Sequence, residues 1–172
     1  MKVQRWNKFF FFLLFIPLAY GSNSANYKVL PGKLHKKGKV IVNILPDQET
    51  YRVKMDFNVK KKDFVPVPSK LLKGSTIMEF PDKFRTEAGY KELQKKGKIE
   101  IHNAELRFVK RADYHGLKDA YFIEVKPKNK KSRIDIIYHP SLPSVGWEKV
   151  EITFLSKIPV LDGYELEAVL KE

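Results

Sequence analysis

The stretch Tyr51-Arg-Val-Lys-Met-Asp-Phe-Asn-Val59 decides the fold class of this 172-residue chain. Each odd-numbered position in it is apolar, and each residue between two of them is charged or polar. Alternation of this kind over nine residues predicts a β-strand with one buried face and one face in water. The side chains expected on the buried face are those of Tyr51, Val53, Met55, Phe57 and Val59.

The same alternation recurs on both sides of this stretch. At His102-Asn103 the apolar positions slip by one residue, which predicts a β-bulge. We therefore expect a mainly β fold, an antiparallel β-sandwich or a small β-barrel of about eight or nine strands. The further strands are predicted over residues 40–45, 76–80, 99–108, 121–125, 134–138, 150–154 and 164–170.

One short helix is expected, from Asp82 or Phe84 to Lys96. Asp82 follows a proline and is suited to cap the first turn, and Gly97 is suited to end the helix in a left-handed conformation. Eight or nine strands also suit a membrane-spanning barrel, which needs strands of about 9–11 residues with a continuous apolar outer band. The expected strands are mostly shorter and their polar faces are heavily charged, so that alternative is the weaker one.

The first 21 residues have the pattern of an export signal. Three basic residues lie within the first eight positions, followed by the apolar run Phe9–Ile16 and the small residues Ala19 and Gly21. This order predicts a secretory signal peptide over residues 1–21, because a membrane anchor would need about 20 apolar residues. The rest of the chain is expected to divide into an N-terminal arm, residues 22–37, and a single β-rich domain, residues 38–172.

The absence of cysteine bears on where such a protein would work. The chain has 33 Lys and Arg against 20 Asp and Glu, and no cysteine, which excludes disulfides and thiolate metal sites. Small exported domains usually depend on disulfides, whereas a domain of this size can be stable without them. We therefore expect an exported protein of a bacterial envelope, most simply periplasmic, with the extracellular space as the alternative.

No pattern of residues indicates catalysis. The four histidines show no metal-ligand spacing, and the chain has neither a G-x-S-x-G elbow nor a glycine-rich phosphate loop. Asp113 and His115 form an acid–imidazole pair, but Gly116 favours a plain turn there. We therefore assign no catalytic residue, no metal and no cofactor, and expect a protein that is not an enzyme.

Five cations lie within eight residues of one polar loop. Such a cluster attracts anions, although the plain alternative is a solvated turn. The partners that would fit are an anionic lipid, an acidic glycan or an acidic envelope protein, with peripheral membrane contact at most; nucleic acid is not expected. The predicted anion contacts are Lys126, Lys128, Lys130, Lys131 and Arg133.

The segment from Tyr138 to Trp147 contains two prolines, which restrict it and present its side chains at low entropic cost. Tyr138, His139 and Trp147 are of types that anchor binding surfaces, so we predict that they contact a ligand or partner. The alternative is that Trp147 begins the next strand and fills the core.

These patterns together favour a non-enzymatic binding or accessory protein for an amphipathic or anionic ligand. The alternative is a protein–protein interaction or structural module without a small-molecule site. The volume inside the β-domain separates the two, because ligand cavities begin at roughly 300 Å³.

Overall fold

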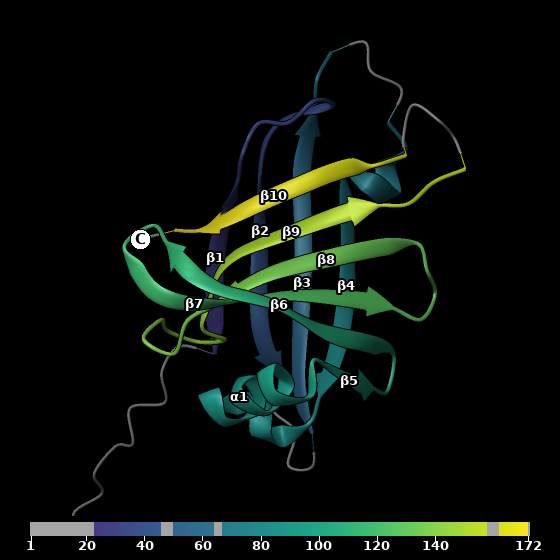
Figure 1. The fold of residues 1–172 in the computed structure, drawn as a ribbon. Helices are drawn as coiled ribbons and strands as arrows, with labels where there is room; N and C mark the ends of the chain where they lie inside the picture. The colour runs from purple at the N-terminus through teal and green to yellow at the C-terminus, as the bar shows by residue number, and fades with distance from the viewer. Residues whose placement is uncertain (1–22, 46–49, 64–66, 158–161, 172) are drawn as a thin grey trace, which may run out of the picture.

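Antiparallel strands make up most of the folded chain (Figure 1). The computed structural model describes residues 23–45, 50–63, 67–157 and 162–171, so the expected signal peptide lies outside the described residues. Within these ranges there are ten strands, one α-helix and two short 3-10 helices. The strands are β1 (Ser24–Val29), β2 (His35–Leu45), β3 (Tyr51–Lys61), β4 (Lys73–Phe80), β5 (Lys98–Ile101), β6 (Ala104–Tyr114), β7 (Leu117–Pro127), β8 (Ser132–Tyr138), β9 (Trp147–Phe154) and β10 (Tyr164–Leu170). The helices are η1 (Ser69–Leu71), η2 (Asp82–Arg85) and α1 (Glu87–Lys96).

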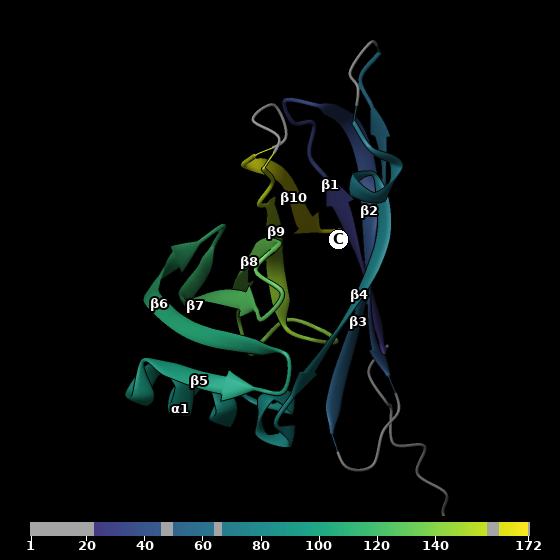
Figure 2. The same ribbon diagram turned by 90° about the vertical axis from the view of Figure 1, so that its right-hand side faces the viewer.

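All ten strands belong to one sheet, in the order β4-β3-β2-β1-β10-β9-β8-β7-β6-β5. The sheet curls into two layers, with β1–β4 on one side and β6–β10 on the other, and α1 lies across one end of the space between them (Figure 2). The result is a nearly closed barrel. Its two edge strands, β4 and β5, are not neighbours in the sheet, and we call the line along which these edges face each other the seam.

The expected mainly β fold with one helix is confirmed, but the strand count is ten. Two strands exceed the eight predicted ranges: residues 99–108 form two strands, β5 and β6, and β1 lies within the segment predicted to be an arm. Strand β1 occupies the middle of the sheet, where Tyr27 pairs with Val40 on β2 and with Leu170 on β10. Ala25, Tyr27 and Val29 are buried and alternate with polar residues, but residues 22–37 are polar overall, and that composition favoured an arm.

Residues 51–59 form most of β3, with the expected side chains on the buried face. The relative exposure of its five apolar side chains is between 0 and 8%. Arg52, Lys54 and Asp56 are half-buried on the other face, and Asn58 is exposed. Strands β2, β3, β6 and β7 each have 11 residues, longer than the sequence pattern suggested.

The phase slip at His102-Asn103 is a hairpin turn, so the predicted bulge is wrong. These two residues connect β5 to β6, and Ile101 pairs directly with Ala104. A two-residue turn places the residues before and after it on the same face of the sheet, because paired residues share a face. The chain therefore changes from odd to even buried positions without an extra residue in a strand.

Helix α1 begins later than expected. Thr86, not Asp82, is its N-cap, and the Thr86 Oγ1 accepts a hydrogen bond from the Ala88 N–H at 3.4 Å. Asp82 instead begins the 3-10 helix η2. Gly97 ends the helix as predicted, with a φ of 75° and its N–H bonded to the Leu93 carbonyl.

Aromatic side chains fill the end of the barrel that α1 covers. Tyr90 of α1 stacks on Tyr138 of β8 with ring centroids 3.5 Å apart, and Trp147 Nε1 donates to the Tyr90 hydroxyl at 3.2 Å. Phe84 of η2 meets Tyr90 edge to face at 5.1 Å, and Phe80 of β4 meets Trp147 at 6.1 Å. Five rings from five separate elements thus close this end, which we call the helix end.

Candidate ligand-binding cavity

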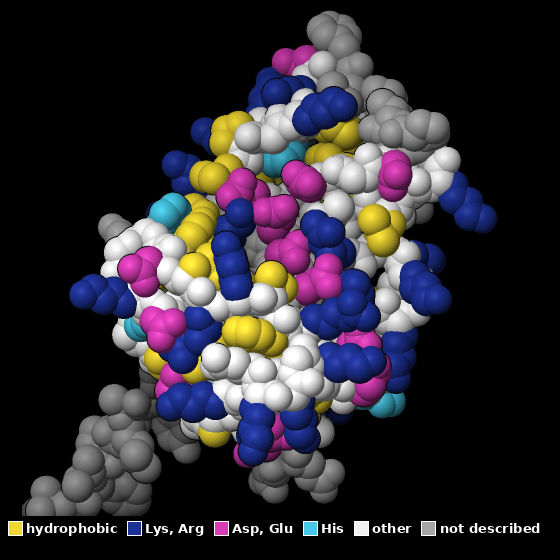
Figure 3. Space-filling view, viewed as in Figure 1, with side chains coloured by type: hydrophobic (Ala, Val, Ile, Leu, Met, Phe, Trp, Pro, Cys, Tyr) yellow, Lys and Arg dark blue, Asp and Glu magenta, His cyan; other side chains and the backbone are white. Residues whose placement is uncertain are grey.

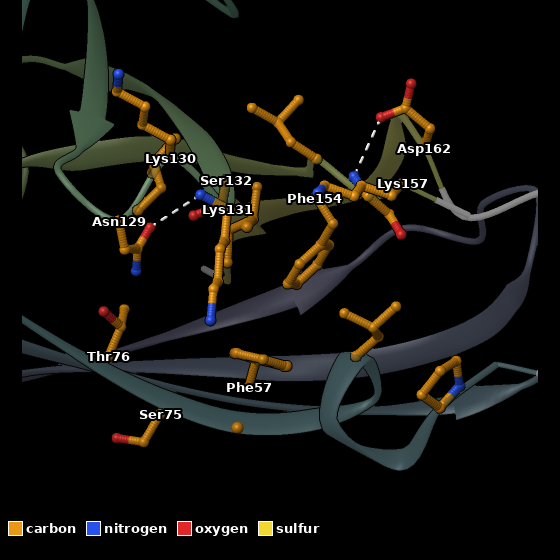
Figure 4. Close-up of a pocket in the computed structure, with 17 residues that line it drawn as sticks. Phe57, Ser75, Thr76, Asn129, Lys130, Lys131, Ser132, Phe154, Lys157 and Asp162 are labelled. Carbon is orange, nitrogen blue, oxygen red and sulfur yellow. Dashed lines mark hydrogen bonds between the residues drawn. The ribbon is translucent and has the colours of Figure 1, made fainter. Parts of the chain in front are cut away.

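A cavity of about 890 Å³ lies between the two layers, away from the helix end (Figure 4). One wall comes from β3, η1 and β4, where Phe57, Leu71 and Thr76 face it. The opposite wall comes from β8 and β9 and carries Ile134, Ile152 and Phe154. We call this end of the barrel, beside edge strand β4, the cavity end. Its lining is mostly apolar, with hydrophobic side chains from β3, η1, β8 and β9, while Thr76 of β4 and Ser132 of β8 add polar groups.

A series of rings leads from the cavity into the sheet. Phe57 and Phe154 meet across the cavity at 6.1 Å, and Phe154 stacks on Tyr164 at 5.6 Å. The Tyr164 hydroxyl donates to His35 Nδ1 at 3.1 Å, and His35 Nε2–H donates to the Leu30 carbonyl at 2.8 Å. Burial lowers the pKa of His35, against the opposing effect of the Leu30 carbonyl. The imidazole is therefore neutral at pH 7, and two hydrogen bonds hold it beside Tyr164.

The five clustered cations have different surroundings. Lys126 pairs with Glu124 at 3.1 Å and Arg133 pairs with Asp135 at 2.9 Å, both on the outer face of the sheet. Lys128 Nζ donates to the His102 carbonyl at 3.0 Å. These three predicted anion contacts are therefore already engaged within the protein. The contacts of all five with an external anion stay a prediction.

Lys130 and Lys131 lie at the cavity and form no ion pair with the described residues. In Figure 4 the Lys131 side chain points across the cavity toward the wall that carries Thr76 and Phe57, whereas Lys130 points away. Lys157 and Asp162 also border the cavity. Three lysines and one aspartate therefore give its lining a net positive charge.

Tyr138 and Trp147 lie in the aromatic packing of the helix end, with relative exposures of 5% and 1%. Burial raises the pKa of Tyr138 to about 12, so its hydroxyl stays protonated. His139 fastens the following loop: its Nε2–H donates to the Lys118 carbonyl at 3.1 Å and its Nδ1 accepts from the Ser141 N–H at 3.2 Å. Their contact with a ligand stays a prediction, and the cavity described above does not include them.

The seam is bridged beside the cavity by the β5–β6 turn. Asn103 Nδ2 donates to the Ile77 carbonyl on β4 at 3.0 Å. On its other side, the Asn103 carbonyl accepts from the Lys128 N–H at 2.9 Å. This turn thus ties edge strand β4 to the end of β7, next to cavity residue Thr76.

A row of four carboxylates crosses the outer face of β7–β10, and the sequence analysis missed it. Glu124 pairs with Asp135, Asp135 with Glu151, and Glu151 with Glu167, so four neighbouring strands each place one acid in register. Acidic and basic side chains are accordingly mixed at the centre of this face (Figure 3). The sequence shows an acid at an outward position of each of these strands, but only the pairing of the strands places the four acids in one row.

The acid row is largely neutralised by basic neighbours. Lys149 Nζ lies 2.9 Å from Glu151 and 2.6 Å from Glu167. Burial alone would lower the pKa of Lys149, but these two contacts outweigh it and raise that pKa. Burial raises the pKa of Asp135 despite Arg133, and Glu151 and Glu124 add to the rise. The row therefore acts as an ion-pair network that holds four strands together.

The residues that the structure describes contain no group of three or more His, Asp or Glu that could hold a metal ion. Asp113 Oδ1 accepts from the Asp119 N–H, and His115 stacks on Tyr114 in the β6–β7 turn. None of the described helices combines the length and apolar character needed to cross a bilayer.

Fold and cavity together define a class: a nearly closed antiparallel barrel with an apolar cavity beside its seam. Comparisons with family models, with curated proteins and with solved structures found no match to this chain.

Proposed function

We propose that this protein is an exported, non-enzymatic binding protein of a bacterial envelope whose cavity holds an apolar or amphipathic molecule. The observation that carries the proposal is the cavity of about 890 Å³ between the layers. Ligand sites in proteins occupy roughly 300–1,000 Å³ and are mostly apolar with a few polar groups. Export is supported by the charge and apolar pattern of residues 1–21.

The free energy for such binding would come from apolar contact. Phe57, Ile134, Ile152 and Phe154 offer a hydrophobic lining, and each Å² of ligand surface removed from water contributes roughly 25 cal/mol. The walls are held by strands that pair along their whole length, so the site is preformed. A preformed site loses little ordering entropy when a ligand binds.

The test uses N-phenyl-1-naphthylamine, a neutral apolar dye whose fluorescence rises in an apolar site, titrated against the purified protein. Thr76→Trp places a large ring in the cavity, because Thr76 lies on the inner face of β4 opposite Met55. Its matched control is Ile77→Trp, the next residue of the same strand. The side chain of Ile77 is 45% exposed on the outer face.

We expect the wild type and Ile77→Trp to bind the dye alike and Thr76→Trp to bind at least tenfold more weakly. Ser132→Phe, which enters the cavity from the opposite wall, gives a second test should Thr76→Trp fold poorly. Absence of dye binding by the wild type would refute the proposal. Equal binding by wild type and both filling variants would place the dye outside the cavity and refute it too.

A protein–protein interaction module remains the second candidate, and one observation favours it. Edge strand β4 exposes Ile77 beside the seam, and exposed edges can pair with another chain. Native mass spectrometry of the protein taken from its own cells would separate the two candidates. A small bound mass supports the binding protein, while a stable complex with another protein and an empty cavity supports the module.

A further inference from the structure

The β7–β8 turn holds Lys131 in a defined place. Lys130 adopts a left-handed conformation with a φ of 55°, and its N–H donates to the Pro127 carbonyl at 3.0 Å. The Lys131 N–H donates to Asn129 Oδ1 at 3.0 Å, and the Lys131 carbonyl accepts from the Leu155 N–H at 2.9 Å. Both backbone groups of Lys131 are therefore fixed, and so is the direction in which its side chain leaves the turn.

The charge around this side chain is not balanced within the described chain. Lys131 points into a cavity with apolar walls and has no carboxylate partner among the described residues (Figure 4). The one acid at the cavity is Asp162, whose Oδ1 accepts from the Ser156 N–H at 3.2 Å. Lys131 is exposed to solvent at the edge of the cavity, so its ammonium group can meet an anion there without breaking a contact within the described chain. Such an uncompensated positive charge attracts anions.

Apolar and cationic features are separated within the cavity. Phe57, Ile152 and Phe154 lie between the layers, whereas Lys131 and Lys157 lie where the β7–β8 turn and the end of β9 reach the surface. A molecule with an apolar body and one anionic end matches this arrangement. Its body would bury apolar surface, and its charged end would stay near Lys131 and solvent.

We propose that the ligand is an anionic amphiphile, bound with its apolar tail between the layers and its carboxylate or phosphate head group at Lys131. The proposal rests on the proposed function and names the class of molecule that the same cavity takes. It also separates Lys131 from the rest of the basic cluster: Lys126, Lys128 and Arg133 are engaged within the protein, and Lys130 points elsewhere.

The experiment compares four compounds by calorimetric titration at constant ionic strength. They are hexadecanoate, monohexadecyl phosphate, hexadecanol and inorganic phosphate. The first two share a tail and differ in the anionic head, the third has the tail without charge, and the fourth has charge without a tail. The variants are Lys131→Gln and its matched control Lys130→Gln, which removes the same charge from the adjacent residue.

We expect wild type to bind the two anionic amphiphiles at least tenfold more tightly than hexadecanol, and inorganic phosphate too weakly to measure. Lys131→Gln should lose that tenfold preference, Lys130→Gln should keep it, and neither should alter hexadecanol binding. Equal losses in the two variants, or equal wild-type binding of acid and alcohol, would overturn the inference. Hexadecanol binding would still support the cavity in that case, whereas failure of every tailed compound would refute the proposed function itself.

Discussion

The two ends of the space between the layers are built in opposite ways. At the helix end, Trp147 and Tyr90 share a hydrogen bond and the Trp147 carbonyl accepts from the Tyr27 hydroxyl at 2.7 Å. At the cavity end, Phe57 and Phe154 meet at 6.1 Å beside about 890 Å³ of unfilled volume. One end is filled by rings with satisfied polar groups, and the other leaves its rings facing a cavity that opens to solvent.

This difference separates stability from binding within one sheet. Close packing stabilises a fold because each buried side chain gains dispersion contacts, and a void forfeits them. A barrel that keeps a cavity open at one end must be held by its other parts, here the helix end and the outer ion-pair network. Substitutions at the helix end should therefore affect mainly stability, and those at the cavity end mainly binding.

The largest expected effect comes from Trp147→Ala. Its ring is 1% exposed, and its removal would leave a large cavity and the Tyr90 hydroxyl without its donor. We expect the free energy of unfolding to fall by about 3–5 kcal/mol, the range for deleting a buried large aromatic side chain. Phe154→Ala, at a half-buried ring of the cavity end, should cost about 1–2 kcal/mol.

Urea denaturation followed by circular dichroism measures both values. The quantity compared is the loss of unfolding free energy in each variant relative to the wild type, so the two variants serve as controls for each other. A loss for Phe154→Ala as large as that for Trp147→Ala would show that the cavity end is packed as firmly as the helix end.

Two glycines make the same comparison on a smaller scale. A Cβ added at Gly89 would lie 2.8 Å from Phe84 Cγ and 2.9 Å from the Lys83 backbone, which cannot move aside. At Gly74 it would lie 2.5 Å from Phe57 Cζ, the tip of a ring that borders the cavity. We expect Gly89→Ala to cost about 1–3 kcal/mol through overpacking.

Gly74→Ala should cost less than about 1 kcal/mol, because the Phe57 ring can turn into the empty volume. The same movement should weaken binding of N-phenyl-1-naphthylamine severalfold. Thermal unfolding and dye titration of both variants provide the measurements. If Gly74→Ala destabilises the protein strongly and leaves dye binding unchanged, the Phe57 ring has no room to move. The expected difference between the two glycine variants would then be wrong.

Much of this architecture follows from the sequence, and the remainder depends on pairing between distant residues. Alternation from Tyr51 to Val59 reveals which side chains are buried, because a period of two is a local property of a strand. It does not reveal which strand lies beside which. Tyr27 and Leu170 are partners from the two ends of the described chain, and nothing local marks them as such.

The same limit applies to the candidate site. The basic cluster was visible in the sequence, but a charge run does not say which of its members points into a cavity. That distinction for Lys131 comes from the left-handed Lys130 and from the hydrogen bond with Leu155, which directly follows β9. The acid row is similar: outward acids are visible in each strand, and their alignment appears only when Asp135 pairs with both Glu124 and Glu151.

His35 makes the stability of the fold depend on pH. Burial lowers its pKa below the ordinary value of 6.5, and Lys62 lowers it further. The unfolded chain therefore binds this proton more readily than the folded one, so folding loses stability as the pH falls below about 6.5. The slope should approach about 1.4 kcal/mol per pH unit until the folded-state pKa is reached.

His35→Gln keeps hydrogen-bonding capacity but does not titrate, and His139→Gln serves as the control because His139 lies in a loop near the surface. Between pH 4.5 and 8, the urea midpoint should fall less steeply with acid in His35→Gln than in the wild type. In His139→Gln the slope of the midpoint against pH should match that of the wild type. The other charged groups around His35, namely Lys33, Asp162, Glu165 and Glu167, are the same in all three proteins. Parallel curves for all three would show that His35 is not the source.

The smallest expected effect on stability concerns the seam itself. In Asn103 the amide Nδ2 donates to the Ile77 carbonyl, while its Oδ1 is buried without a hydrogen-bond partner among the described residues. Asn103→Ala removes a favourable bond worth about 1 kcal/mol and an unpaired acceptor that costs a similar amount. We therefore expect the free energy of unfolding to change by no more than about 0.5 kcal/mol.

The main effect of Asn103→Ala should appear in the kinetics of ligand binding, because edge strand β4 would no longer be tied to the β5–β6 turn next to Thr76. Stopped-flow mixing with N-phenyl-1-naphthylamine should give association and dissociation rates that both rise severalfold, with little change in affinity. A control, Asn129→Ala, alters the neighbouring turn without touching this bond and should leave the seam closed. Unchanged rates together with a clear loss of stability in Asn103→Ala would mean that this hydrogen bond supports the barrel and does not control entry to the cavity.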